Sequence, residues 1–328
     1  MLILNILVKE QLIPLTIVYF PNFMYKFSIL DLWPYIGIAL IFILCYAYKL
    51  KNSSKIIYVV FLLFCILRYD VGWDYFAYVE EIKLGTINER YEPISKAIFK
   101  LGAIIDFYPL VFFVFAFFTL FLVRKSIQRY SNNPIISWLV YFSLPLFFFA
   151  SLSTIRQGLA TAIILYSYKY LEQNKNFSFL LSIIVASLIH VSGLAGIFVW
   201  IIYKIRVNRI FNIFLFIASF IFPLFVKDVI TNILSNYIPD AVVSIRLQSY
   251  INTKTQSPNL LQYLYYTFAL INLLFYKQLI NASESNKQFI SLVTFGVVIF
   301  NIMSFEPISA TRISAFYLIF LIYIIPYY

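Results

Sequence analysis

Apolar runs repeat along almost the whole of this 328-residue chain, and most of them contain no charged residue. They cover residues 34–48, 55–68, 107–123, 134–150, 156–171, 177–190, 192–203, 210–226, 260–276, 289–304 and 313–326. Hydrophobic residues make up 62% of the chain and charged residues 12%, against about 45–50% and about 25% in soluble domains. Since a soluble core could not bury this much apolar surface, the surplus must face lipid.

The runs predict a protein built from membrane-spanning helices. An upright span needs about 20 residues, so the shorter runs are expected to cross with snorkelling ends, local bilayer thinning or partial re-entry. We therefore predict an all-α, polytopic integral membrane protein with about ten or eleven transmembrane helices. No Gly/Ser linker, long charge run or internal repeat divides the sequence, which indicates a single membrane domain over residues 1–328.

The N-terminal segment, residues 1–30, differs from the later runs. Residues 1–21 are apolar, but Lys9 and Glu10 interrupt them and no small-residue cleavage site follows. We interpret it as an interfacial or loosely inserted segment rather than a cleaved signal peptide, with a true first span as the alternative.

The basic residues predict the orientation of the spans. The formal net charge of +11 lies in short clusters between apolar runs, a pattern typical of cytoplasmic loops rather than of a nucleic-acid surface. All clusters face the cytoplasm if residues 177–203 cross twice, as two short helices that break near His190–Gly193. If this segment crosses once, the later clusters face outward. The double crossing leaves two larger outer loops, residues 69–106 and 227–259.

Ionisable residues then gather on the outer side, where their cost makes them functional candidates. They are Arg68, Asp74, Glu92, Arg156, His190 and Arg312. Most also have a structural interpretation, as snorkelling anchors, solvated or helix-start carboxylates, or a satisfied buried imidazole. Arg156 fits such an interpretation least, because a cation at a helix N-terminus opposes the helix dipole and an outer position opposes the charge bias.

The residue types in this group indicate a particular chemistry. Arginines beside a helix N-terminus form an anion site, and carboxylates or a histidine can act as a general base. Aromatic residues such as Trp73 and Tyr75 suit sugar faces, although rings also populate membrane interfaces. A single histidine and two isolated cysteines, Cys45 and Cys65, predict neither a histidine or cysteine metal site nor a disulfide framework. An anionic, lipid-linked sugar at the outer leaflet fits all of these features.

The order of these motifs resembles one family. Arg68…Val71-Gly72-Trp73-Asp74-Tyr75, Glu92-Pro93, Ser153…Arg156-Gln157, Ala186…His190-Val-Ser192 and Arg312 follow one another over residues 68–312. This set resembles the EpsG-like branch of the Wzy-type polysaccharide polymerases, which make O-antigen, capsule or exopolysaccharide.

The resemblance implies a GT-C-like fold in a bacterial inner membrane, with the active site facing the periplasmic side. It implies a glycosyltransferase that polymerises undecaprenyl-diphosphate-linked oligosaccharide units without a metal or cofactor. The expected partners are that substrate, membrane lipid, a chain-length regulator and a flippase, with no nucleic acid. As a hypothesis, the diphosphate is bound by Arg156, Arg312 and Arg68. The candidate general bases are His190, Asp74 and Glu92. Further contacts to the substrate are expected from Gln157, Tyr75, Trp73 and Ser192.

Two alternatives stay open at this point. The first is a single-sugar transferase of the GT-C type, or a glycan ligase. Metal-dependent enzymes of this kind often carry a closely spaced acidic pair; Asp70 and Asp74 do not match that spacing, but they do not exclude a bound metal. A lipid-linked oligosaccharide flippase is the other. It should carry charges along a central path at mid-membrane depth, whereas the candidate residues lie at one end of the predicted spans.

Overall fold

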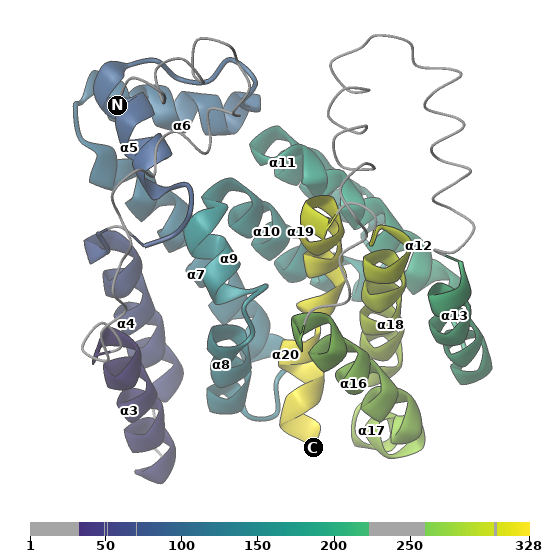
Figure 1. Cartoon of the computed structure of the whole chain (residues 1–328). Helices are drawn as coiled ribbons and strands as arrows, with labels where there is room; N and C mark the ends of the chain where they lie inside the picture. Colours follow the sequence, from purple (N-terminus) through teal and green to yellow (C-terminus); the bar gives the residue numbers. More distant parts are fainter. Residues whose placement is uncertain (1–32, 49, 51, 70, 223–259, 305–306) are drawn as a thin grey trace, which may run out of the picture. The chain divides into compact units, whose positions relative to one another are not determined.

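The computed structural model describes residues 33–48, 50, 52–69, 71–222, 260–304 and 307–328. Every regular element in this part of the chain is helical, which confirms the all-α prediction (Figure 1). The predicted N-terminal segment 1–30 and outer loop 227–259 lie outside the described residues.

The chain divides into two compact units, Met1–Leu44 and Cys45–Tyr328. The described part of the first unit belongs to helix α3 (Trp33–Ala47), which continues for three residues into the second. All candidate site residues belong to the second unit. A single membrane domain stays a prediction.

The second unit is a succession of short and medium helices. They are α4 (Ser53–Leu67), α5 (Tyr75–Leu84), α6 (Pro93–Ile104), α7 (Tyr108–Tyr130), α8 (Pro134–Ser143), α9 (Phe148–Ser153), α10 (Ile155–Glu172), α11 (Asn176–Ile189), the 3-10 helix η2 (Val191–Ala195), α12 (Gly196–Ile205), α13 (Arg209–Ile221), α16 (Leu260–Leu274), α17 (Tyr276–Ala282), α18 (Asn286–Ile302), α19 (Pro307–Leu318), α20 (Leu321–Ile324) and the 3-10 helix η3 (Ile325–Tyr327).

Two helical stretches among the described residues, Tyr108–Tyr130 and Ile308–Tyr327, are long and apolar enough to cross a membrane. Shorter apolar helices of 10–17 residues accompany them. This arrangement agrees with a membrane protein, while a total of ten or eleven spans and a GT-C-like fold stay predictions. The helix break predicted near His190 is present, because α11 ends at Ile189 and η2 begins at Val191.

The predicted run 134–150 is two helices rather than one, and this corrects the sequence prediction. Helix α8 ends at Ser143, and α9 begins only at Phe148. Pro145 lies between them, and proline disfavours helical backbone in the residue before it and removes an N–H donor. A continuous apolar run therefore says little about helix continuity when it contains a proline.

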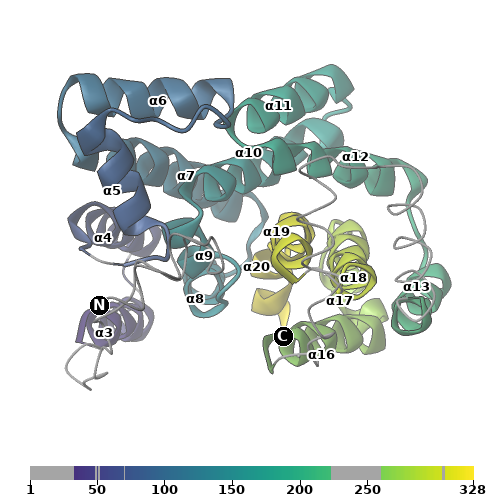
Figure 2. The ribbon, with the colours of Figure 1, turned by 45° about the horizontal axis from the view of Figure 1, so that its top comes forward.

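An apolar core cluster lies beneath the candidate site and joins α5, α6, α7, α10 and the end of α11. Its buried members are Tyr75, Tyr78, Ile82, Ile87, Phe99, Val111, Phe112, Phe115, Ile155, Leu159 and Ile189. Helix α10 packs against both α7 and α11, and α6 contacts the same two helices (Figure 2). The cluster therefore fixes the first turn of α10 relative to the loop that precedes α6.

The turn between α11 and η2 depends on a close backbone approach at Gly193. A Cβ atom there would lie 2.6 Å from the carbonyl carbon of Ala186 and 2.7 Å from the backbone nitrogen of Ser187. Backbone atoms cannot rotate away as a side chain can, so any side chain at this position forces α11 and η2 apart.

We predict that Gly193→Ala lowers the free energy of unfolding by about 1–3 kcal/mol because of this overlap. The measurement is the melting temperature of the detergent-solubilised protein. Gly37→Ala is the matched control, since a Cβ at Gly37 meets no atom within 4 Å. Equal melting temperatures for the two variants would contradict the prediction.

Candidate active site

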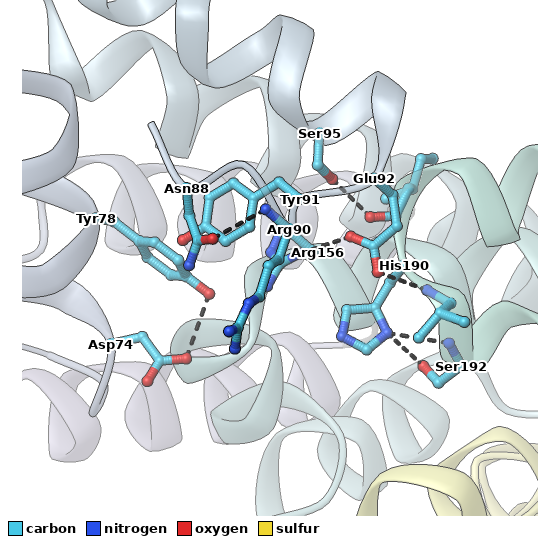
Figure 3. Close-up of polar contacts among 12 residues, drawn as sticks. Asp74, Tyr78, Asn88, Arg90, Tyr91, Glu92, Ser95, Arg156, His190 and Ser192 are labelled. Atoms are coloured by element: carbon cyan, nitrogen blue, oxygen red, sulfur yellow. Dashed lines mark hydrogen bonds and ion pairs between the residues drawn. The ribbon is translucent and has the colours of Figure 1, made fainter. Parts of the chain in front are cut away.

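Three segments that are far apart in the sequence meet above the core cluster. They are the loop that ends at Glu92, the first turn of α10 and the turn from His190 to Ser192 (Figure 3). Pro93 occupies the first turn of α6, where its missing N–H costs nothing. The Ser95 hydroxyl donates to the Ile189 carbonyl at 2.6 Å, so the start of α6 is joined directly to the end of α11.

Glu92 bridges the other two segments. Its Oε2 accepts from Arg156 Nη1 at 2.6 Å, and its Oε1 accepts from the Val191 backbone N–H at 2.8 Å. The side chains of Arg156 and Glu92 are only 17% and 16% exposed. The carboxylate thus supplies the counter-charge that a cation at a helix N-terminus otherwise lacks, and it brings Arg156 and the His190 turn to the same place.

Arg156 is also held from its face. Its guanidinium carbon lies 3.9 Å from the centroid of the Tyr91 ring, which is cation–π distance. The Tyr91 hydroxyl donates to Glu81 Oε1 at 3.1 Å.

Sequence reasoning counted Tyr78 and Tyr91 only among the aromatic rings around the site and assigned no role to Glu81. Asp74, Tyr78 and Glu81 are four and three residues apart around the start of α5, and such residues neighbour one another on a helix. This spacing is the signal that could have identified Tyr78 and Glu81. No comparable signal points to Tyr91, because its contact with Arg156 depends on tertiary packing.

Asp74 lies at the start of α5, where its Oδ2 accepts from the Tyr78 hydroxyl at 3.3 Å. Burial raises the pKa of this carboxyl, and the Tyr78 hydrogen bond and the charges of Arg312 and Arg156 oppose the rise. The predicted acid and both predicted arginines are therefore within electrostatic reach of one another. A raised pKa brings a carboxylate closer to the range in which it accepts protons efficiently near neutral pH.

His190 caps η2 through its ring. Its Nδ1 lies 2.7 Å from Ser192 Oγ and accepts from the Ser192 backbone N–H at 3.2 Å. Since a backbone N–H can only donate, Nδ1 is the acceptor and Nε2 carries the proton of the neutral ring. Burial lowers the pKa of His190 to about 4, with Glu92 opposing this change and Arg156 and Arg312 adding to it. The imidazole is thus neutral at pH 7.

Arg312 reaches the site from α19. Gln157 Nε2 donates to the Arg312 backbone carbonyl at 2.7 Å, so a buried side chain of α10 holds the α19 backbone beside it. The Arg312 side chain is exposed, and no ion pair within the described part of the chain includes it. Its positive charge is therefore available to an anionic ligand.

Arg68 and Tyr75, two further predicted substrate contacts, pack in the protein interior. Arg68 is 9% exposed and donates from Nη1 to the Leu152 carbonyl at 2.7 Å. Its guanidinium lies 4.6 Å from the Phe112 ring centroid, and Tyr75, 2% exposed, stacks on the same ring at 5.2 Å. These positions favour structural roles. Their predicted substrate contacts stay untested and gain no support.

Trp73 and Ser192 differ from that pair. The Trp73 side chain is 89% exposed, and its backbone N–H donates to Ser153 Oγ at 3.3 Å, so the ring is free to meet a ligand. Ser192 contacts His190 and orients the imidazole. Across the described ranges, no group of three or more metal-ligating side chains lies close enough to hold an ion.

We predict that Glu92→Ala destabilises the protein by about 1–3 kcal/mol, because it leaves Arg156 and the Val191 N–H without their acceptor. Thermal unfolding in detergent measures the change. Glu89→Ala is the control. Glu89 lies in the same loop as Glu92 and pairs with Lys96 of α6, but the Glu89 side chain is 82% exposed. We expect Glu89→Ala to leave the melting temperature unchanged; a comparable loss in both variants would refute a bridging role for Glu92.

The lowered pKa of His190 predicts a pH dependence of stability. A histidine whose pKa falls on folding binds its proton more readily in the unfolded state, so stability is retained above about pH 6.5 and is lost as the pH falls toward 4. Because His190 is the only histidine of the chain, His190→Gln should show a smaller decrease in melting temperature between pH 7 and pH 4.5. Parallel decreases in the two proteins would show that the imidazole is not held neutral by folding.

Comparison with known proteins adds an independent finding. A family model described as the EpsG family matches residues 55–328, a range that includes the whole candidate site. No curated protein and no solved structure matches the chain. Because the family model covers most of the sequence, the resemblance inferred from the ordered motifs is confirmed: the chain belongs to the EpsG family.

Proposed function

We propose that the chain polymerises oligosaccharide repeat units carried on undecaprenyl diphosphate, at the outer face of a bacterial inner membrane. It would transfer the growing glycan from its lipid diphosphate to a hydroxyl at the non-reducing end of another lipid-linked unit. Membership of the EpsG family supports polysaccharide biosynthesis of the polymerase type. The observation that carries the mechanism is that Glu92, Asp74 and His190 all lie within electrostatic reach of Arg156, and that Arg312 acts on Asp74 and His190 as well.

The arginines suit the leaving group. When the acceptor oxygen attacks the anomeric carbon, the bond from that carbon to the diphosphate oxygen breaks, and negative charge develops on the diphosphate. Arg312, exposed and without an ion-pair partner in the described ranges, would neutralise this charge together with Arg156 and the N–H groups at the start of α10. One preorganised donor of this kind contributes about 3–4 kcal/mol.

Asp74 suits the general base better than the other two candidates. Both oxygens of Glu92 are already engaged, one by Arg156 and one by a backbone N–H. His190 has its Nδ1 occupied and carries its proton on Nε2. Asp74 accepts only the long Tyr78 bond in the described structure, and its pKa is raised by burial. The acceptor hydroxyl would therefore lose its proton to Asp74.

His190 and Trp73 then have different tasks. A neutral Nε2–H is a hydrogen-bond donor and would bind a diphosphate or sugar oxygen near Arg312. The exposed Trp73 ring, one residue before Asp74, would pack against a sugar face of the acceptor.

We expect Arg156→Ala and Asp74→Asn to abolish long-chain product, because they remove leaving-group stabilisation and the base respectively. The loss of rate should reach about 10²–10³-fold for the arginine and about 10²–10⁴-fold for the acid. The measurement is complementation of a deletion strain, with lipid-linked and surface polysaccharide resolved on a gel. Arg156→Lys tests whether charge alone is sufficient.

Arg129→Ala is the matched control, since Arg129 is also ion-paired but to Glu172 at the other end of α10. It should retain full-length product at normal protein levels. Full-length chains from Arg156→Ala would defeat the assignment. The deletion itself separates the alternatives: single repeat units on the cell surface support a polymerase, whereas units trapped inside the cell would indicate a flippase.

A further inference from the structure

The Tyr91 ring packs against the guanidinium of Arg156, and the proposed reaction assigns no role to this contact. Tyr91 and Glu92 are consecutive, and they contact the same guanidinium from two directions. The Tyr91 ring lies beneath its face at 3.9 Å, and Glu92 Oε2 lies at its edge at 2.6 Å from Nη1. A flat cation held by a face and an edge has little freedom to rotate, so the direction of its remaining N–H groups is fixed.

Glu81 in turn holds Tyr91. Its Oε1 accepts the Tyr91 hydroxyl at 3.1 Å, and the ring also packs edge-on against Phe99 at 5.1 Å. A phenol that donates to a carboxylate gains electron density in its ring, which strengthens the attraction of the ring face for a cation. Glu81 is therefore connected to Arg156 through Tyr91, in addition to the direct attraction between the two charges.

The chemistry of Glu81 argues against a purely space-filling role. Glu81 is half-buried on α5, and burying a carboxylate costs free energy unless a partner offsets it. Burial raises the pKa of Glu81, and the Tyr91 hydroxyl and the Asn88 backbone oppose the rise. A hydrophobic residue would fill this position at lower cost, so the acid is of use only through its acceptor oxygen and its charge.

We propose that Tyr91 and Glu81 are positioning residues that aim the Arg156 guanidinium at the substrate diphosphate. Glu81 fixes and polarises the ring, and the ring fixes the plane of the cation. The proposal rests on the proposed function, because it assigns Arg156 a diphosphate to bind. It adds two residues that act through Arg156 rather than on the reacting atoms.

The test compares Tyr91→Leu, Tyr91→Trp, Tyr91→Phe, Glu81→Gln and the Tyr91→Phe/Glu81→Gln double variant. Each is assayed in membranes with lipid-linked units extracted from the deletion strain, at protein levels matched by in-gel fluorescence of a fused reporter. Tyr91→Leu should lower the polymerisation rate about 10- to 30-fold through loss of the cation–π contact. Tyr91→Trp should restore most of that loss, since indole is the strongest cation–π partner.

The double variant tests whether the two residues act together. If Glu81 works only through the Tyr91 hydroxyl, Tyr91→Phe/Glu81→Gln should be no slower than the worse single variant, within about twofold. Tyr108→Leu is the control: Lys83 lies 5.5 Å from the Tyr108 ring centroid, a cation–π pair that does not include Arg156. It should retain the wild-type rate.

Arg156→Ala is assayed in parallel, so that failure of the positioning role can be distinguished from failure of the proposed function. An inactive Arg156→Ala with a near-wild-type Tyr91→Leu would overturn the positioning role alone. An active Arg156→Ala would overturn the proposed function and the positioning role with it. Failure of Tyr91→Trp to improve on Tyr91→Leu, or fully additive losses in the double variant, would also count against the proposal.

Discussion

The ion pair between Arg156 and Glu92 is the contact on which the rest of the site depends. It joins the first turn of α10 to the loop before α6, two positions 64 residues apart, and the second oxygen of Glu92 adds the turn after α11. Without the carboxylate, a half-buried arginine at a helix N-terminus would face both desolvation and an opposing dipole. With it, three segments are fixed relative to one another by a single side chain.

The ion pair also determines which of the other ionisable groups in the site have free hydrogen-bonding atoms or charge for a ligand. Both oxygens of Glu92 accept hydrogen bonds, one from Arg156 and one from the Val191 N–H, whereas burial raises the pKa of Asp74. Glu92 pairs with Arg156, whereas Arg312 has no ion-pair partner among the described residues. In the proposed reaction, Asp74 on the α5 side is the base, the exposed Arg312 on the α19 side is the cation for the diphosphate, and the neutral imidazole of His190 is a hydrogen-bond donor.

Particular residues show how far sequence reasoning reached. Arg156 was identified because a cation there opposes both the helix dipole and the charge bias of outer positions. The structure gives the reason: its partner, Glu92, comes from another segment. His190 was identified as a helix end, and α11 does end there. Arg68 and Tyr75 were also selected, yet both are packed around Phe112. Their sequence motif indicates residue polarity and spacing, whereas burial depends on which helix covers them.

Taken alone, the sequence determined the properties that depend on local composition. Charge-poor apolar runs specify helices in a lipid environment, and the ordered motifs specify the EpsG family. Only the tertiary structure decided which carboxylate pairs with Arg156, that Tyr91 and Glu81 support it, and that Asp74 retains a weakly bonded oxygen. These features depend on side chains that meet from distant segments, and no local pattern encodes the angle at which two helices pack.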